Sequence, residues 1–222
     1  MAYSSIFDTA ENRKRKWDSS ISEISERVSS FFWDNAPHQY GLEAREGQQD
    51  MAFEILDAIR GSYHIAVEAG VGIGKSYAYL VPLLLYNQKT KLPVVIATST
   101  IALQEQLMGD IERISPMIGV HPEVLLAKGQ THYICQMRAT DYFATPEGQP
   151  LARLKQLIDE GCQDRRTFPT PIPSNVWDKI NVVRYSRRIC FGCPFSDRCQ
   201  YATLRDNMKY TNGIILCNQD PL

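Results

Sequence analysis

Lys75 and Ser76 end a short glycine-rich segment, and together they could hold the phosphates and the metal ion of a nucleotide. An apolar run at 65–67 precedes the segment and a helix-like pattern at 77–85 follows it, which is the strand, loop and helix order of a phosphate-binding loop. In such a loop the lysine binds the β- and γ-phosphates, and the hydroxyl binds Mg²⁺. We therefore expect nucleotide binding here. The predicted loop comprises Glu68, Ala69, Gly70, Val71, Gly72, Ile73, Gly74, Lys75 and Ser76.

Three glycines, Gly70, Gly72 and Gly74, let the backbone of this loop curl so that successive N–H groups point at one anion. The helix that follows directs its positive end at the same place. The alternative is an ordinary glycine-rich turn, which a Gly-Lys-Ser sequence between a strand and a helix disfavours. Ala69 stands where the strict pattern has glycine, so the match is to a looser form of the motif.

Two residues ahead of the loop could recognise the base of a nucleotide. A side-chain amide can both donate to and accept from the edge of adenine, and an aromatic ring can stack on it. Gln48, at the start of a helical pattern, and Tyr40 could do these two jobs. The alternative for Gln48 is a solvated residue at a helix start, and its position ahead of the loop favours the first interpretation.

Apolar runs at 93–97, 124–127 and 213–217 predict further strands, and a helix-like segment separates the first two. The first run is fully apolar, which is typical of a buried central strand. Strands that alternate with helices imply an α/β fold with a parallel, doubly wound sheet. The hydroxyl residues at 98–100 suit phosphate oxygens of a nucleic acid, the cap of the next helix, or both.

From 128 to 210 the alternation of strands and helices is lost, and we predict a small inserted domain there. The 222 residues are enough for one α/β domain and a smaller insertion. We expect an N-terminal helix and the first part of the α/β domain at 1–127, the insertion at 128–210, and a return to the α/β domain at 211–222.

Four cysteines of the insertion have the spacing of a metal or cluster site. Cys190, Cys193 and Cys199 form a C-x2-C-x5-C pattern, and Cys135 could close the site from the other end. Four thiolates serve Zn²⁺ or an iron–sulfur cluster, and either would hold together a domain too small to be stable alone. Unliganded thiols are the alternative, which three cysteines so close together disfavour. Cys162 is a spare candidate ligand.

Composition favours a cytoplasmic protein without a membrane span. No apolar run approaches the ~20 residues that cross a bilayer, and the segment 1–17 is too polar for a signal peptide. In a reducing compartment, cysteines serve as ligands or core residues more often than as disulfides. Cys217 lies in an apolar run and fits a core thiol.

The net charge of −1 does not call for nucleic acid, but the segment 179–209 is locally basic, with seven cations and two acids. Cations bind phosphates and aromatic rings stack on bases, so this mixture suits single-stranded nucleic acid. The alternative is a solvated cationic face beside a small aromatic core. The residues are Lys179, Arg184, Arg187, Arg188, Arg198, Arg205 and Lys209, interleaved with Tyr185, Phe191, Phe195, Tyr201 and Tyr210.

Together these features resemble the iron–sulfur DNA helicases, the XPD/DinG family of helicase superfamily two, and DinG-like bacterial members above all. The segment from Arg45 to Gln48 resembles the family's adenine-reading Q motif, and the glycine-rich loop resembles its motif I. The segment 97–107 resembles motif Ia, which contacts the DNA backbone. The cysteines resemble the ligands of a cluster domain inserted in the first motor lobe. The resemblance therefore implies a RecA-like P-loop lobe with an inserted iron–sulfur domain.

The resemblance also implies an activity. It implies ATP, Mg²⁺ and a [4Fe-4S] cluster as cofactors, with Cys135, Cys190, Cys193 and Cys199 as the cluster ligands. It implies ATP-driven 5′→3′ movement along single-stranded DNA and unwinding of duplexes and DNA junctions, as in DNA repair. Lys75 and Ser76 would then be catalytic, and Arg45 and Gln48 would bind the nucleotide.

Two features of that family have no counterpart in this sequence. The family has an Asp-Glu-x-His box that holds Mg²⁺ and activates water, whereas Asp159-Glu160 continues with Gly161-Cys162. The second motor lobe is also missing, and Gln219 stands where the family often has histidine. We expect the N-terminal part of a longer helicase, inactive alone. The alternatives are a non-catalytic nucleic-acid-binding module with zinc-bound cysteines, and a small regulatory ATPase unrelated to DNA.

Overall fold

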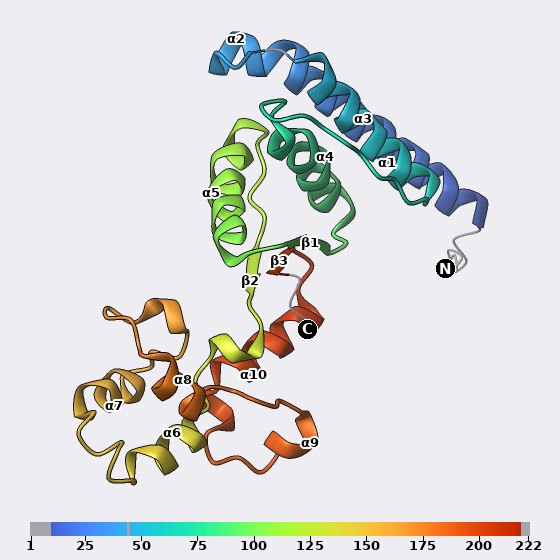
Figure 1. Ribbon diagram of the computed structural model, residues 1–222. Helices are drawn as coiled ribbons and strands as arrows, with labels where there is room; N and C mark the ends of the chain where they lie inside the picture. Colours follow the sequence, from blue (N-terminus) through green and yellow to red (C-terminus); the bar gives the residue numbers. More distant parts are fainter. Residues whose placement is uncertain (1–9, 44, 219–222) are drawn as a thin grey trace, which may run out of the picture. The chain divides into compact units, whose positions relative to one another are not determined.

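The computed structural model describes residues 10–43 and 45–218 (Figure 1). The chain divides into two compact units. The first takes in the described residues up to Ile96, together with 102–124 and 212–216. The second takes in 97–101, 125–211 and the described residues from Cys217 onward. Gln219, singled out above, lies outside the described residues.

The first unit is built on a group of helices. In α1 the residues Ile21, Ile24 and Val28 recur at helical spacing and are buried, so one face of this helix packs while the other meets solvent. The helices α1, α3 and α4 pack against one another and lie side by side (Figure 1). The helices are α1 (Ala10–Ser30), a π-helical turn (Phe31–Asn35), α2 (Ala36–Tyr40), α3 (Glu46–Gly61), α4 (Lys75–Thr90) and α5 (Ile101–Met117).

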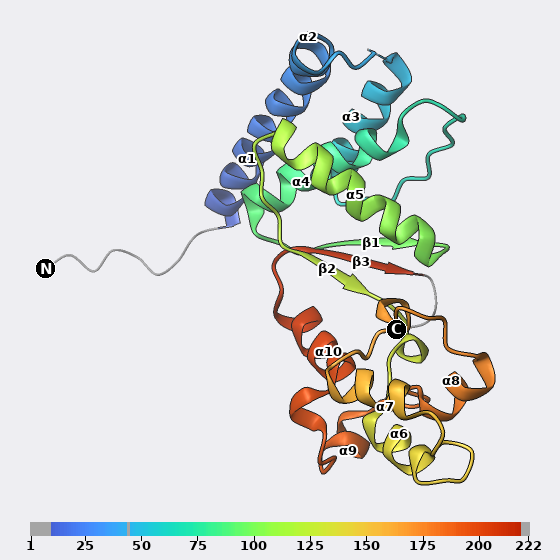
Figure 2. The same ribbon diagram turned by 90° about the vertical axis from the view of Figure 1, so that its left-hand side faces the viewer.

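Three strands form a parallel sheet in the order β1-β3-β2 (Figure 2). They are β1 (Val94–Thr98), β2 (Val124–Ala127) and β3 (Ile214–Asn218). Every residue of β3 is buried, as the middle position requires. The buried side-chain amide of Asn87, in α4, donates to the carbonyl oxygens of Leu92 at 2.8 Å and Asn212 at 2.6 Å. These two residues lie just before β1 and β3, so the amide positions the segments that lead into both strands.

Two expectations about strands are wrong. In the sheet that the described residues form, the run at 93–97 is an edge strand instead of the buried central one, and Val95 is 60% exposed. An apolar run shows that a segment suits a strand, but it does not give the place of that strand in the sheet. The run at 65–67 forms no strand, and both Ile65 and Val67 are exposed. No strand of the described residues pairs with it, so its backbone lacks the ladder that would define one.

The second unit has its own hydrophobic core, which the irregular sequence does not reveal. The fully buried Trp177 lies in this core, and its indole N–H donates to the carbonyl oxygen of Thr131 at 2.7 Å. The buried Lys128 pairs with Asp164 at 2.5 Å where the unit begins. Its α-helices are α6 (Gln136–Phe143), α7 (Ala152–Asp159), α8 (Ser174–Ile180), α9 (Arg187–Cys190) and α10 (Gln200–Tyr210), with short 3-10 turns between several of them.

Among the described residues, no helix combines the length and the apolar character needed to cross a membrane.

Candidate nucleotide and metal sites

The glycine-rich loop leads into α4, which begins at Lys75 with Gly74 as its N-terminal cap. Gly72 and Gly74 have φ angles of +87° and +82°, a region that other residues rarely adopt. A Cβ atom on Gly74 would come within 2.2 Å of Nε2 of Gln48, so this position excludes a side chain by space as well as by backbone conformation. Two of the three loop glycines, Gly72 and Gly74, therefore adopt the backbone conformation that favours glycine.

Lys75 and Ser76 lie in the first turn of α4, where backbone N–H groups have no partner within the helix. The ammonium of Lys75 donates to the carbonyl oxygens of Ala69 at 2.9 Å and Gly70 at 2.8 Å, which places the charge over the start of the loop. Ser76 forms a hydrogen bond with Tyr79, one turn along; burial raises the pKa of that phenol and this bond opposes the rise. A cation, a hydroxyl and the positive end of a helix thus meet where a phosphate group could bind.

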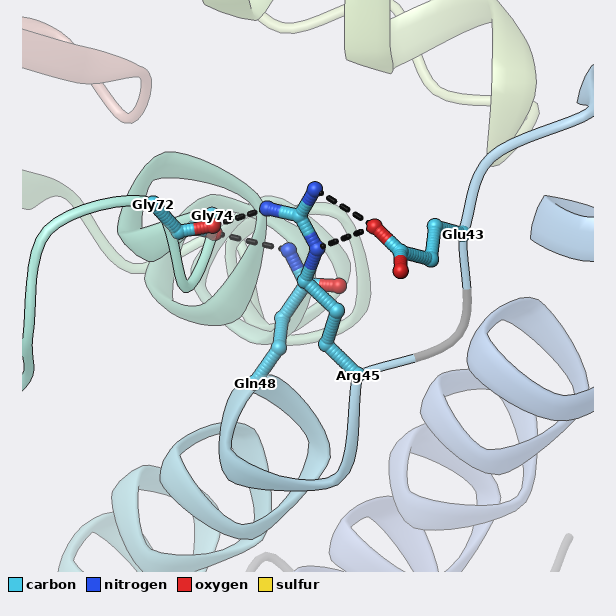
Figure 3. Close-up of polar contacts among 5 residues, drawn as sticks. All are labelled: Glu43, Arg45, Gln48, Gly72 and Gly74. Atoms are coloured by element: carbon cyan, nitrogen blue, oxygen red, sulfur yellow. Dashed lines mark hydrogen bonds and ion pairs between the residues drawn. The ribbon is translucent and has the colours of Figure 1, made fainter.

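Two side chains at the start of α3 form hydrogen bonds with the backbone of the loop (Figure 3). Arg45 is the N-terminal cap of this helix, and Gln48 lies in its first turn. Gln48 donates through Nε2 to the carbonyl oxygen of Gly74 at 2.8 Å. Arg45 donates to the carbonyl oxygen of Gly72, and its other nitrogens contact Glu43 at 2.8 and 3.0 Å. The segment expected to read adenine is therefore joined directly to the backbone of the phosphate loop. Sequence reasoning missed Glu43, although a carboxylate two residues before Arg45 could have suggested a partner.

A cavity of 140 Å³ lies beside Gln48 and Gly74, and its walls combine apolar and aromatic side chains with the charged Glu43 and Arg45. Phe31 and Tyr77 line it, and their rings are nearly parallel at 6.3 Å between centroids. Tyr40 is not among the residues that line it, and its hydroxyl donates to the carbonyl oxygen of Met117 at 3.4 Å. The two aromatic residues were missed because their spacing is that of ordinary helix core positions.

The second unit contains a cavity of 630 Å³, and all four cysteines of the predicted site line it. Cys135 and Cys199 are the caps at the starts of α6 and α10, and Cys190 ends α9. The N–H of Cys193 donates to the carbonyl oxygen of Cys190 at 3.1 Å, so the C-x2-C pair forms one turn. These cysteines are free thiols. The structure thus brings together residues that the sequence places in separate segments.

The surroundings of Cys199 raise the pKa of its thiol. Burial raises the pKa of Cys199, and the neighbouring Cys135 and Cys190 raise it further, while backbone N–H groups of Tyr201 and Ala202 act in the opposite direction. In the part of the chain that the structure describes, no group of three or more His, Cys, Asp or Glu side chains is arranged around one metal ion.

The remaining cysteines lie elsewhere. Cys162 packs against the hydrophobic core of the second unit, and it is not among the residues that line the cavity. Cys217 is buried in β3, where burial raises the pKa of its thiol. Their positions agree with the interpretation of Cys217 as a core residue and leave the four cavity cysteines as the candidate ligands.

The comparisons with known proteins point to one family. Residues 45–148 match the DEAD/DEAH box helicase family. The chain is 30% identical over 187 residues to the ATP-dependent helicase DinG of Mycobacterium tuberculosis (strain H37Ra), and 32% identical over 197 residues to the ATP-dependent DNA helicase DinG of Photobacterium profundum. These alignments cover 72% and 77% of this chain and 28% of each relative. The chain belongs to the DinG-like helicases.

A shorter alignment gives 38% identity over 96 residues to the 3'-5' exonuclease DinG of Bacillus subtilis, which is 43% of this chain and 10% of that protein. The chain therefore spans less than a third of the length of the relatives named here. Membership of the helicase family agrees with the expected RecA-like α/β lobe. The helicase match begins at Arg45 and includes the whole loop and Cys135, but it ends before Cys190, Cys193 and Cys199.

The segment expected to contact the DNA backbone in this family joins β1 to α5. Thr98 is buried and donates to the carbonyl oxygen of Thr100 at 2.9 Å, so its hydroxyl has a structural use. Ser99 and Thr100 are exposed immediately before α5 begins. The hydroxyl of Thr98 therefore has a local backbone partner. Contact between these hydroxyl residues and the phosphates of DNA stays a prediction.

The basic and aromatic residues gather partly around the cysteine cavity. Arg184, Arg187 and Phe195 line it with Phe191, whose ring is 91% exposed. Arg187 pairs with Asp206 at 2.5 Å, so part of its charge is already balanced. An exposed ring beside guanidinium groups has the composition that the sequence predicted for a single-stranded nucleic-acid surface.

Proposed function

We propose that this chain is the ATP-binding and cluster-bearing part of a DinG-like helicase that moves 5′→3′ on single-stranded DNA and unwinds duplexes. The observation that carries the proposal is the loop between Gly70 and Ser76, whose glycines adopt positive φ angles at the start of α4 beside Lys75. The relatives named as ATP-dependent helicases share this part of the chain with it.

In this proposal Lys75 binds the β- and γ-phosphates and Ser76 holds Mg²⁺. Gln48 and Arg45 keep the carbonyl oxygens of Gly74 and Gly72 turned away from the phosphates, so the N–H groups of the loop face the anion. The cavity beside Gln48 would receive the base, with Phe31 and Tyr77 as aromatic walls. Charge neutralisation by the lysine and the helix end would supply most of the affinity for phosphate.

For the four-cysteine cavity we propose a [4Fe-4S] cluster in preference to zinc. Four cysteine sulfurs that bind one zinc ion must lie close to one another. In a four-iron cluster each cysteine binds a different iron, so the cysteine sulfurs lie farther apart. A 630 Å³ cavity lined by four thiols has room for the larger group, and the resemblance to iron–sulfur helicases favours that group over zinc. When bound, such a cluster would cross-link the segments that carry its ligands. The exposed aromatic and basic residues around the cavity would then contact single-stranded DNA and DNA junctions.

Titration calorimetry with ATP and Mg²⁺ tests the nucleotide site. Lys75→Ala removes the cation from the phosphate site, and we expect an affinity about 100-fold weaker, as for loss of a charge-assisted hydrogen bond. Lys89→Ala is the matched control, because Lys89 lies in the last turn of the same helix and pairs with Glu23 on the surface. Equal affinities of the two variants would refute the assignment of this loop.

A further inference from the structure

Gln163 lies between α7 and α10 in the sequence and is 2% exposed. Its side-chain Nε2 donates to the carbonyl oxygen of Arg198 at 2.7 Å, and its Oε1 accepts from the backbone N–H of Gln200 at 2.9 Å. These two residues are the immediate neighbours of Cys199. One buried amide therefore holds the backbone on both sides of a cysteine that lines the cavity.

The backbone of Gln163 reaches a second cysteine of the cavity. Its carbonyl oxygen accepts from the N–H of Ile134 at 2.8 Å, and Ile134 directly precedes Cys135. The N–H of Cys135 donates in turn to the carbonyl oxygen of Ile180 at 2.8 Å. Gln163 thus joins two cysteine-bearing segments that are distant in the sequence.

The contact with Gln200 also bears on the sulfur of Cys199. Cys199 is the cap of α10, and the N–H of Gln200 is the first of the helix N–H groups that have no partner within it. Gln163 accepts from that group, and so it holds the first residue of α10 directly beside Cys199, whose own side chain makes no capping hydrogen bond there. Hydrogen bonds to ligand sulfurs, together with the residues that orient them, tune the stability and potential of a cluster.

We propose that Gln163 is a positioning residue of the cysteine site, which orients Cys199 through the backbone of residues 198 and 200 and ties it to the segment of Cys135. The inference rests on the proposed cluster. Nothing in the sequence marks Gln163, which lies outside the C-x2-C-x5-C pattern and follows the spare Cys162. A purely structural role in the core would change the stability of the second unit but leave the properties of a bound cluster unchanged.

The test compares three variants of the full chain, each loaded with iron and sulfide under anaerobic conditions. Gln163→Leu removes both side-chain hydrogen bonds at similar volume, and Gln163→Glu keeps the acceptor for Gln200 but loses the donor to Arg198. Gln156→Leu is the matched control, since Gln156 is exposed on α7 and its side chain bonds to Arg153 in the same helix and to the cap residue Glu160. The measurements are the rate at which a chelator bleaches the absorbance near ~400 nm and the reduction potential of the cluster.

We expect Gln163→Leu to bleach about tenfold faster than the control, with a shifted potential, and Gln163→Glu to fall between them. If Gln163→Leu takes up no iron, the Glu variant decides, and it must bleach faster than the wild-type chain. A wild-type chain that holds the cluster, with Gln163 variants that match Gln156→Leu in both measurements, would overturn this inference alone. A wild-type chain that binds no iron would overturn the proposed cluster as well.

Discussion

The phosphate loop of the first unit is assembled from two short stretches, 43–48 and 69–76, whereas the cavity of the second unit draws its four cysteines from helix ends and turns spread over 135–199. In the loop, the conformation follows from local glycines and from two side chains that bind carbonyl oxygens. In the cavity, the positions of the cysteines depend on a separate core around Trp177 and on buried polar contacts. We conclude that the loop is fixed mainly by backbone conformation and the cavity mainly by tertiary structure.

The largest expected effect concerns the cavity. Cys190→Ser removes one ligand, and we expect loss of bound iron and protease sensitivity throughout the second unit, because ligand binding contributes to the folding of such a site. The affinity for ATP should stay within about twofold of wild type, since no part of the loop lies in this unit. Limited proteolysis measures the sensitivity of the second unit, and titration calorimetry measures the affinity for ATP. A Cys217→Ser variant should retain its iron, because Cys217 is buried in β3.

The next effect tests whether the second unit depends on buried polar contacts. Lys128→Ala leaves the mostly buried carboxylate of Asp164 without its cation, so we expect the second unit to lose about 3 kcal/mol of unfolding free energy, the lower end for a buried pair. Lys155→Ala breaks an exposed pair with Asp159 and should cost about 0.3–0.5 kcal/mol. Urea unfolding followed by the fluorescence of Trp177 measures the difference, in a chain whose other two tryptophans, Trp17 and Trp33, are replaced by phenylalanine. Similar values for both variants would show that the buried pair does not stabilise the unit.

The smallest effect tests the backbone of the loop. Gly74→Ala places a side chain at a positive φ and against Gln48, so we expect about tenfold weaker ATP binding, a loss of about 1.4 kcal/mol. Gly72→Ala has the same backbone strain, but no described atom lies within 4 Å of its Cβ, and it should weaken binding less. Gly109→Ala, in the interior of α5, should leave binding unchanged and stabilise the helix by about 1 kcal/mol. Stronger binding by Gly74→Ala than by Gly72→Ala would contradict this order.

The sequence predicted those parts of the sites that depend on local chemistry. The loop, the start of α4 beside Lys75 and the gathering of four cysteines were all expected, because glycines, Gly-Lys-Ser and cysteine spacing have direct physical meanings. The strand at 65–67 and the central place of 93–97 were not found in the structure, since apolar runs do not reveal their neighbours in a sheet. Phe31, Tyr77 and Gln163 could not be predicted, because their roles come from residues far away in the sequence.

Elemental and sulfide analysis of the anaerobically purified chain tests the central claim about the second unit most directly. A [4Fe-4S] cluster held by Cys135, Cys190, Cys193 and Cys199 predicts about four irons and four inorganic sulfides per chain. The preparation should be brown, and Cys190→Ser purified in the same way should lose the iron and the colour. Stoichiometric zinc without iron or sulfide would contradict the account.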